Sequence, residues 1–96
     1  MVKYEALYII KPDMADEERA ALIARFSALI TDNGGEVENI DEWGNKKLAY
    51  PINYITEGYY VLMNFKAAPE MPAELERNFK ISDFVMRYMV IRRDED

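Results

Sequence analysis

Six patterned segments follow one another along the chain, and their order restricts the possible folds more than any other feature of the sequence. Runs rich in aromatic and β-branched residues indicate strands, whereas apolar residues three or four apart indicate helices. The predicted elements are a strand at 3–10, a helix at 16–30, a long bent strand at 37–52, a strand at 59–65, a short helix and a strand at 85–91. Pro69 and Pro72 bracket the start of the short helix, and its apolar stripe lies at 74–80. Two strand–helix–strand units in this order pack as a four-stranded antiparallel sheet with both helices on one face. The sequence therefore predicts an α+β fold of the ferredoxin-like βαββαβ class, with the other face of the sheet open.

Polar residues and glycines set the expected boundaries of the first helix. Asp13 or Asp16 is expected to cap its start, because a short carboxylate accepts hydrogen bonds from the first helical N–H groups. Gly34 and Gly35 are expected to end it, since glycine accepts the left-handed conformation at a helix terminus. In the strand before this helix, alternation puts four residues on one face: Tyr4, Ala6, Tyr8 and Ile10.

The middle of the chain contains two interruptions. Gly44 and Asn45 fit either a β-bulge or the tip of a hairpin, and we favour a bulge within one long bent strand. Residues 53–58 are predicted to form the turn that leads into the next strand.

Length and composition exclude several classes of protein. A chain of 96 residues, half of them apolar, is expected to form one domain at 1–93 followed by an acidic tail at 94–96. Its apolar runs fall far short of the roughly 20 residues that cross a bilayer as a helix, and its start lacks the pattern of an export signal. With no cysteine and no histidine, thiolate chemistry and the commonest metal ligand are excluded. We expect a cytoplasmic protein without cofactor, metal, membrane contact or small-molecule substrate.

Acidic and glycine-rich segments give little indication of catalysis. Asp41 and Glu42 are adjacent, so in a strand their side chains point to opposite faces and cannot act as a carboxylate pair. The Gly34-Gly35 pair lacks the spaced glycines and lysine of a phosphate-binding loop, and it follows a helix instead of preceding one. The acidic run at 16–18 has no glycine-hinged loop that would arrange it around a cation. The sequence therefore predicts a protein that is not an enzyme.

Charge is distributed unevenly along the chain. The formal net charge of −6 argues against a nucleic-acid partner, because phosphate binding depends on basic side chains. Residues 13–42 contain nine acidic and two basic side chains, however, whereas residues 43–93 contain eight basic and five acidic ones. Basic residues in the second part stand beside aromatic ones, a combination that suits phosphates and bases. An ordinary charged surface is the alternative interpretation.

Several motifs together resemble one known family. They are Tyr4-Glu5, Pro12, the segment Gly44-x-Lys46-Lys47-Leu48-Ala49-Tyr50-Pro51-Ile52, Gly58-Tyr59-Tyr60, and Ile81-x-Asp83-x-Val85-x-Arg87-x-Met89. In this order, from Lys3 to Arg92, the chain resembles the family of bacterial small-subunit ribosomal protein six. The resemblance implies a ferredoxin-like fold, a structural role without catalysis, and binding to the central domain of 16S ribosomal RNA together with ribosomal protein S18.

The resemblance also implies which residues make these contacts. The expected RNA-binding residues are basic and lie at strand ends: Lys3, Lys46, Lys47, Arg87, Arg92 and Arg93. Lys46 and Lys47 stand where the family commonly has arginines, so positive charge is kept while forked hydrogen bonding is lost. The candidate partner-binding residues are Trp43, Tyr50 and Pro51, which offer exposed rings on a bent strand, although Trp43 and Tyr50 would equally serve to cover the core.

Two other functional classes fit the predicted fold. A small dimeric ferredoxin-like enzyme would need a pocket with a catalytic group, which here would come from carboxylates, arginines or tyrosines. A ligand-sensing regulatory domain would dimerise through its open sheet face, and a defined dimer that binds an amino acid would favour this class. Neither alternative has a motif of its own in the sequence.

Overall fold

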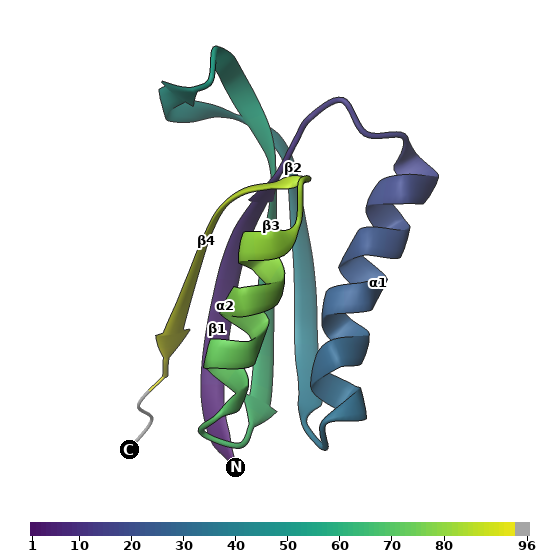
Figure 1. Ribbon diagram of the computed structural model, residues 1–96, viewed down its shortest axis with the longest axis vertical. Helices are drawn as coiled ribbons and strands as arrows, with labels where there is room; N and C mark the ends of the chain where they lie inside the picture. The colour runs from purple at the N-terminus through teal and green to yellow at the C-terminus, as the bar shows by residue number, and fades with distance from the viewer. Residues whose placement is uncertain (94–96) are drawn as a thin grey trace.

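The computed structural model describes residues 1–93, and the acidic tail expected at 94–96 lies outside the described residues. The elements follow the predicted order (Figure 1): β1 Val2–Ile10, α1 Asp16–Asp32, β2 Glu36–Ile52, β3 Ile55–Ala67, α2 Met71–Ile81 and β4 Val85–Arg92. The predicted long strand is present as β2, and the second helix begins at Met71, between Pro69 and Pro72 as expected.

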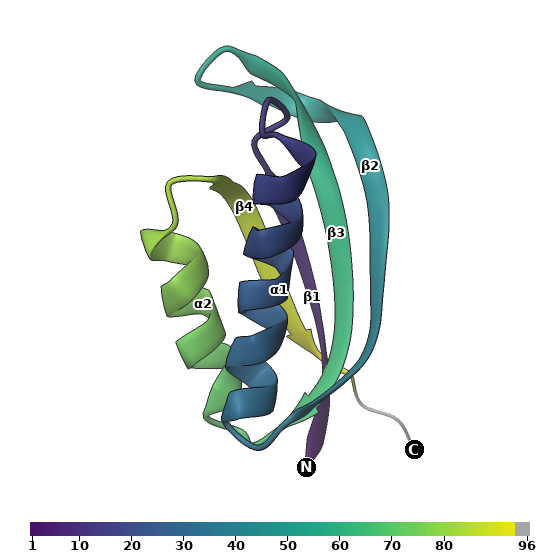
Figure 2. The ribbon, with the colours of Figure 1, turned by 90° about the vertical axis from the view of Figure 1, so that its right-hand side faces the viewer.

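The strands form one antiparallel sheet in the order β2-β3-β1-β4. Figure 2 shows both helices on the same side of this sheet, with the opposite side uncovered. The ferredoxin-like βαββαβ architecture predicted from the order of segments is therefore confirmed. We refer to the uncovered side as the open sheet face.

Aromatic rings join the helices to the sheet. The ring centroid of Tyr8 lies 4.8 Å from that of Phe79 and 5.2 Å from that of Phe26, while Phe26 and Phe79 are 4.7 Å apart. These rings come from β1, α1 and α2, so one cluster connects three elements that are distant in the sequence. The four β1 residues predicted to share a face are all buried in this core.

The two ends of α1 differ in how well the sequence predicted them. The cap position is Ala15, which makes no side-chain hydrogen bond to the helix, so the expected cap by Asp13 or Asp16 is wrong. Asp16 already lies inside the first turn, where its carboxylate accepts a hydrogen bond of 2.7 Å from Arg19. At the other end Gly34 has a φ of 84°, which confirms that glycine ends this helix.

β2 and β3 continue beyond the end of β1 and form a two-stranded ribbon. β1 ends at Ile10 opposite Tyr59, whereas the pairing of β2 with β3 continues to Ile52 and Ile55. We call residues 46–58 the hairpin extension. Register shifts in β2, including one between Glu42 and Gly44, interrupt its ladder, and bulges of this kind bend a strand. Figure 2 shows the extension curving toward the side of the sheet that carries the helices.

The turn at the tip of the hairpin extension is shorter than predicted. Its central residues are Asn53 and Tyr54, with φ values of 49° and 68°, and β3 resumes at Ile55. Two-residue hairpin turns with positive φ at both central positions match the twist of the flanking strands. The predicted turn at 53–58 was therefore too long, because its second part pairs with β2.

The aromatic cluster makes a testable prediction about stability. Phe79→Ala should lower the free energy of unfolding by about 3–5 kcal/mol, since it removes a buried ring that contacts the rings of Tyr8, Phe26 and Tyr88. Phe84→Ala is the matched control, because that ring is 43% exposed and its loss should cost much less. Chemical denaturation followed by circular dichroism measures both changes, and equal losses would show that the cluster has no special role.

Candidate RNA and protein interface

The open sheet face has an apolar centre. Leu7 of β1 stands between Leu62 of β3 and Met89 of β4, and side chains that are directly opposite in neighbouring strands share a face. A shallow hollow of about 170 Å³ lies there, lined by Glu5, Leu7, Trp43, Leu62, Met89 and Ile91. Trp43, Met89 and Ile91 are 41%, 53% and 45% exposed, so this centre is an apolar surface and not part of the core.

Trp43 reaches the open sheet face from the bulge in β2. Its ring stacks on that of Tyr60, with centroids 6.0 Å apart and planes 11° from parallel. Its indole N–H donates to a carboxylate oxygen of Asp41 at 3.1 Å, and the Lys46 ammonium lies 5.7 Å from the ring centroid. These contacts hold the ring at the edge of the hollow, with a positive charge beside it.

One end of the open sheet face gathers positive charge. The backbone N–H of Arg93 donates to the carbonyl of Lys3 at 2.9 Å, which confirms that the two terminal strands lie side by side. Lys3 in turn stands opposite Lys66 of β3. The guanidinium of Arg93 donates to the side-chain oxygen of Asn64 at 3.4 Å, and Lys66 pairs with Glu38 at 3.7 Å.

Arg87 and Lys46 lie toward the opposite end of the same face. Arg87 stands opposite Ile9, and Lys46 stands opposite Gly58. A side chain at position 58 would collide with Ile9, so glycine is needed for β3 to pass β1 here. Lys3 and Ile9 are separated by six residues of extended strand, or about 20 Å, so the basic residues form two groups at the two ends of the face.

Two of the predicted RNA-binding residues point elsewhere. Arg92 stands opposite Tyr4, a core residue, and therefore lies on the side of β4 that faces the helices. Lys47 follows Lys46 in a strand, so the two side chains point to opposite sides of β2. The structure thus separates the six basic residues instead of bringing them into one patch.

The candidate partner-binding residues are also separated. Trp43 lies on the open sheet face, whereas Tyr50 and Pro51 lie farther along β2 in the hairpin extension. Tyr50 is 73% exposed, so the alternative that it covers the core is wrong.

A cluster of polar contacts lies at the base of the hairpin extension. The Tyr59 hydroxyl donates to the Glu42 carboxylate at 2.7 Å, and the Arg19 guanidinium lies 4.0 Å from the centroid of the Tyr59 ring. These residues belong to β3, β2 and α1, so the cluster ties the first helix to the two long strands. The hydrogen bond to Glu42 raises the pKa of the Tyr59 phenol above its ordinary value.

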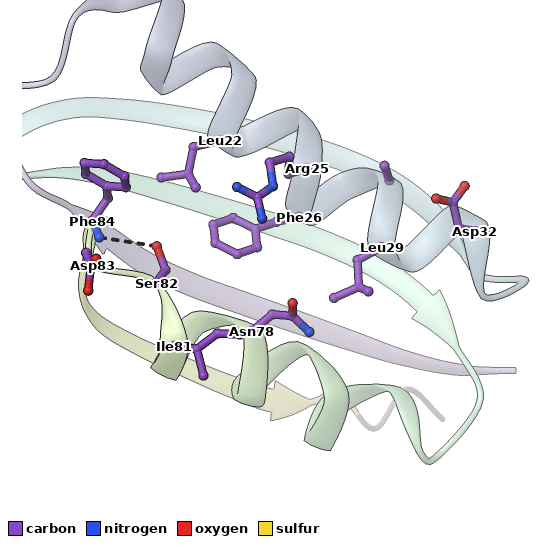
Figure 3. Close-up of a pocket in the computed structure, with 11 residues that line it drawn as sticks. Leu22, Arg25, Phe26, Leu29, Asp32, Asn78, Ile81, Ser82, Asp83 and Phe84 are labelled. Carbon is purple, nitrogen blue, oxygen red and sulfur yellow. Dashed lines mark hydrogen bonds between the residues drawn. The ribbon is translucent and has the colours of Figure 1, made fainter.

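A second concave region lies between the helices, and Figure 3 shows the side chains that line it. It measures about 510 Å³, and Leu22, Phe26 and Leu29 of α1 form its apolar wall. Ser82 accepts a hydrogen bond from the backbone N–H of Phe84 at 3.3 Å, and no acid–base pair contacts this hydroxyl among the described residues. This groove does not have the arrangement of a nucleophilic site.

The described residues offer neither a metal site nor a membrane-spanning helix. Among residues 1–93, no three acidic, histidine or cysteine side chains are grouped so that they could hold a metal ion. No helix in this range is both long and apolar enough to cross a membrane.

Sequence reasoning missed the residues at the centre of the open sheet face. Glu5, Leu7, Leu62, Met89 and Ile91 were not among the expected contacts, although alternation within β1 alone places Glu5 and Leu7 opposite the core face. The signal was therefore present within each strand. Which residues meet across strands depends on the register, which a single sequence does not reveal.

The hydrogen bond between Tyr59 and Glu42 leads to a prediction about the pKa of the Tyr59 phenol. Glu42→Gln should lower the pKa of Tyr59, because the charged acceptor that favours the protonated phenol is replaced by a neutral one. A raised pKa in the folded state contributes stability below pH 10, roughly the unfolded value, and that stability is lost as pH rises through the folded value. An NMR titration of ¹³C-labelled tyrosine, assigned with Tyr59→Phe, measures the change; an unaltered Tyr59 pKa in the glutamine variant would contradict it.

Comparison with known proteins shows which family the chain belongs to. Residues 3–92 match the family model described as ribosomal protein S6. Small ribosomal subunit protein bS6 of Caldanaerobacter subterraneus subsp. tengcongensis is 54% identical over 95 residues, covering 99% of this chain and 100% of that protein. The bS6 protein of Thermoanaerobacter pseudethanolicus is 56% identical with the same coverage.

A solved structure of the same family has the same fold. The crystal structure of 30S ribosomal protein S6 from Thermotoga maritima superposes with a TM-score of 0.90 at 29% identity, covering 96% of this chain and 87% of that chain. These relatives are ribosomal proteins and not enzymes, which sets aside the alternative of a small dimeric enzyme. The chain belongs to the ribosomal protein S6 family and is a protein of the small ribosomal subunit.

Proposed function

We propose that the protein binds the central domain of 16S ribosomal RNA together with ribosomal protein S18, in the ribosomes of the bacterial cytoplasm. The observation that carries this proposal is the open sheet face, which combines an apolar hollow with basic residues at both ends. An apolar centre suits a protein partner, and basic margins suit the phosphates of RNA.

Ribosomal protein S18 would dock on the hollow in the open sheet face. Exposed apolar side chains surrounded by polar ones are the usual anatomy of a protein interface, and Trp43 and Met89 are the large anchors here. Glu5 brings a carboxylate to the lining of the hollow, where a basic residue of the partner would meet an opposite charge. Tyr50 and Pro51 would extend this contact along the hairpin extension.

RNA would be contacted by basic residues at the two ends of the sheet. Lys3 and Arg93 at one end and Arg87 and Lys46 at the other are about 20 Å apart, so the two groups would reach separate stretches of RNA backbone. Lys47 and Arg92, on the other sides of their strands, would contribute less to the same contact. A net charge of −6 opposes RNA binding by this protein alone, and a basic partner would supply the missing positive charge.

The protein contact is tested first with purified S18. Met89→Asp puts a charge into the apolar centre and should weaken the complex by about 30-fold or more, as expected for a central interface residue. Ile81→Asp is the matched control, because Ile81 is 66% exposed on α2 and should leave affinity unchanged. The chain has one tryptophan, so fluorescence of Trp43 reports docking directly, with calorimetry as the second measurement. Equal affinities of both variants would rule out the open sheet face as the docking surface.

The RNA contact is tested on the complex with S18 and a transcribed 16S central-domain fragment. Arg87→Ala and Lys46→Ala should each weaken binding and reduce the slope of log affinity against log salt by about 1, as expected for one lost phosphate contact. Lys80→Ala on α2 is the control and should leave the slope unchanged. If all three variants keep the wild-type slope, the ends of the sheet do not contact RNA.

A further inference from the structure

Tyr54 stands alone at the tip of the hairpin extension. Its side chain is 99% exposed, so the folded chain covers almost none of the ring. It occupies the second central position of the two-residue turn, directly after Asn53, and β3 begins at the next residue. Both flat faces of the ring are therefore accessible from solvent.

The backbone at Tyr54 adopts a conformation that suits other residues better. Its φ of 68° lies in the left-handed region, where a bulky side chain is strained and where glycine or asparagine is preferred. Packing usually offsets such strain, but a ring that is 99% exposed gains no packing. Nothing in the described fold explains why an aromatic residue occupies this position.

The surroundings of Tyr54 favour an anionic partner. The hairpin extension contains Lys46 and Lys47 against a single acidic residue, Glu57, whereas the whole chain carries a net charge of −6. Along an extended chain, Lys47 and Tyr54 are separated by at most about 25 Å, a distance that a few nucleotides of single-stranded RNA can cover. The tip thus presents an uncovered ring on an arm that carries positive charge.

We propose that Tyr54 is an RNA-stacking residue, whose ring packs on an unpaired base of ribosomal RNA while the lysines of the hairpin extension contact its backbone. This inference rests on the proposed function and adds to it a contact outside the sheet face. Aromatic rings with free faces bind single-stranded bases by stacking, and unpaired loops and bulges are where such bases are available. The residues on either side of the two-residue turn, Ile52 and Ile55, pair with each other, which fixes the backbone at Tyr54 and limits the conformational freedom lost on binding.

A protein pocket is a weaker explanation for the same ring. Anchors at protein interfaces cluster in packed patches from which water is excluded, as Trp43, Met89 and Ile91 do around the hollow. Tyr54 has no such neighbours, because almost its entire surface is open to solvent. Stacking of an RNA base, in contrast, requires only one exposed face of an aromatic ring.

The test uses the complex with S18 and the transcribed 16S central-domain fragment. Tyr54→Gly removes the ring and creates an Asn-Gly turn, the pair preferred at positive φ, so thermal stability should be kept or increased. Its affinity for the RNA should fall about 5- to 100-fold, as measured for lost base stacking, while its affinity for S18 is unchanged. Asn53→Gly is the matched control, since it alters the same turn but keeps the ring, and it should bind RNA like the wild type.

Two further variants distinguish stacking from other contacts. Tyr54→Trp should keep the affinity and Tyr54→Leu should lose it, because leucine can fill an apolar pocket but offers no flat ring. Unchanged RNA affinity of Tyr54→Gly would overturn the inference, and so would full affinity of Tyr54→Leu, which would indicate a protein-like pocket. A wild-type complex that fails to bind the fragment would instead contradict the proposed function itself.

Discussion

The pairing of β1 on both sides is the constraint from which the rest of the structure follows. β1 is hydrogen-bonded to β3 along one edge and to β4 along the other, and from Tyr4 to Tyr8 its residues alternate between the core and the open sheet face. Tyr8 and the residues in phase with it anchor both helices, and this alone decides that Glu5 and Leu7 face outward. A shift of one residue would exchange the two sets, so burial of the aromatic core also determines the chemistry of the binding face.

The two long strands give the molecule a second kind of surface. An isolated two-stranded ribbon is only marginally stable in water, so the hairpin extension depends on how firmly its base is held. Arg19, Tyr59 and Glu42 tie that base to α1, while Gly58 lets β3 pass closely over Ile9. The protein therefore combines a supported sheet face with an arm that leaves the body of the sheet, and a partner can engage either of them separately.

Sequence reasoning succeeded where the signal is local. The periodicities of apolar residues gave the order of strands and helices, and the glycine at position 34 marked the end of α1. It failed where a residue had two possible roles. Asp16, expected as a helix cap, instead accepts a hydrogen bond from Arg19 within the first turn, and Ile55 belongs to β3 although it was expected in the turn. Lys3 lies beside Arg93, as expected if the terminal strands pair, but the side of the sheet that Arg92 and Lys47 face depends on the register, which a single sequence does not reveal.

That pairing has a consequence for how the protein is made. The inner strand β1 completes its hydrogen bonds only with β4, the last element, so one edge of β1 stays unsatisfied until residues 85–92 are available. Contacts between distant parts of a chain slow folding, because the loop between them must close first. Until β4 has been synthesised and can pair, the nascent protein presents an unpaired edge and an incomplete core, a state prone to association with other chains. Final folding is thus expected to follow release of the last strand from the ribosome that synthesises it.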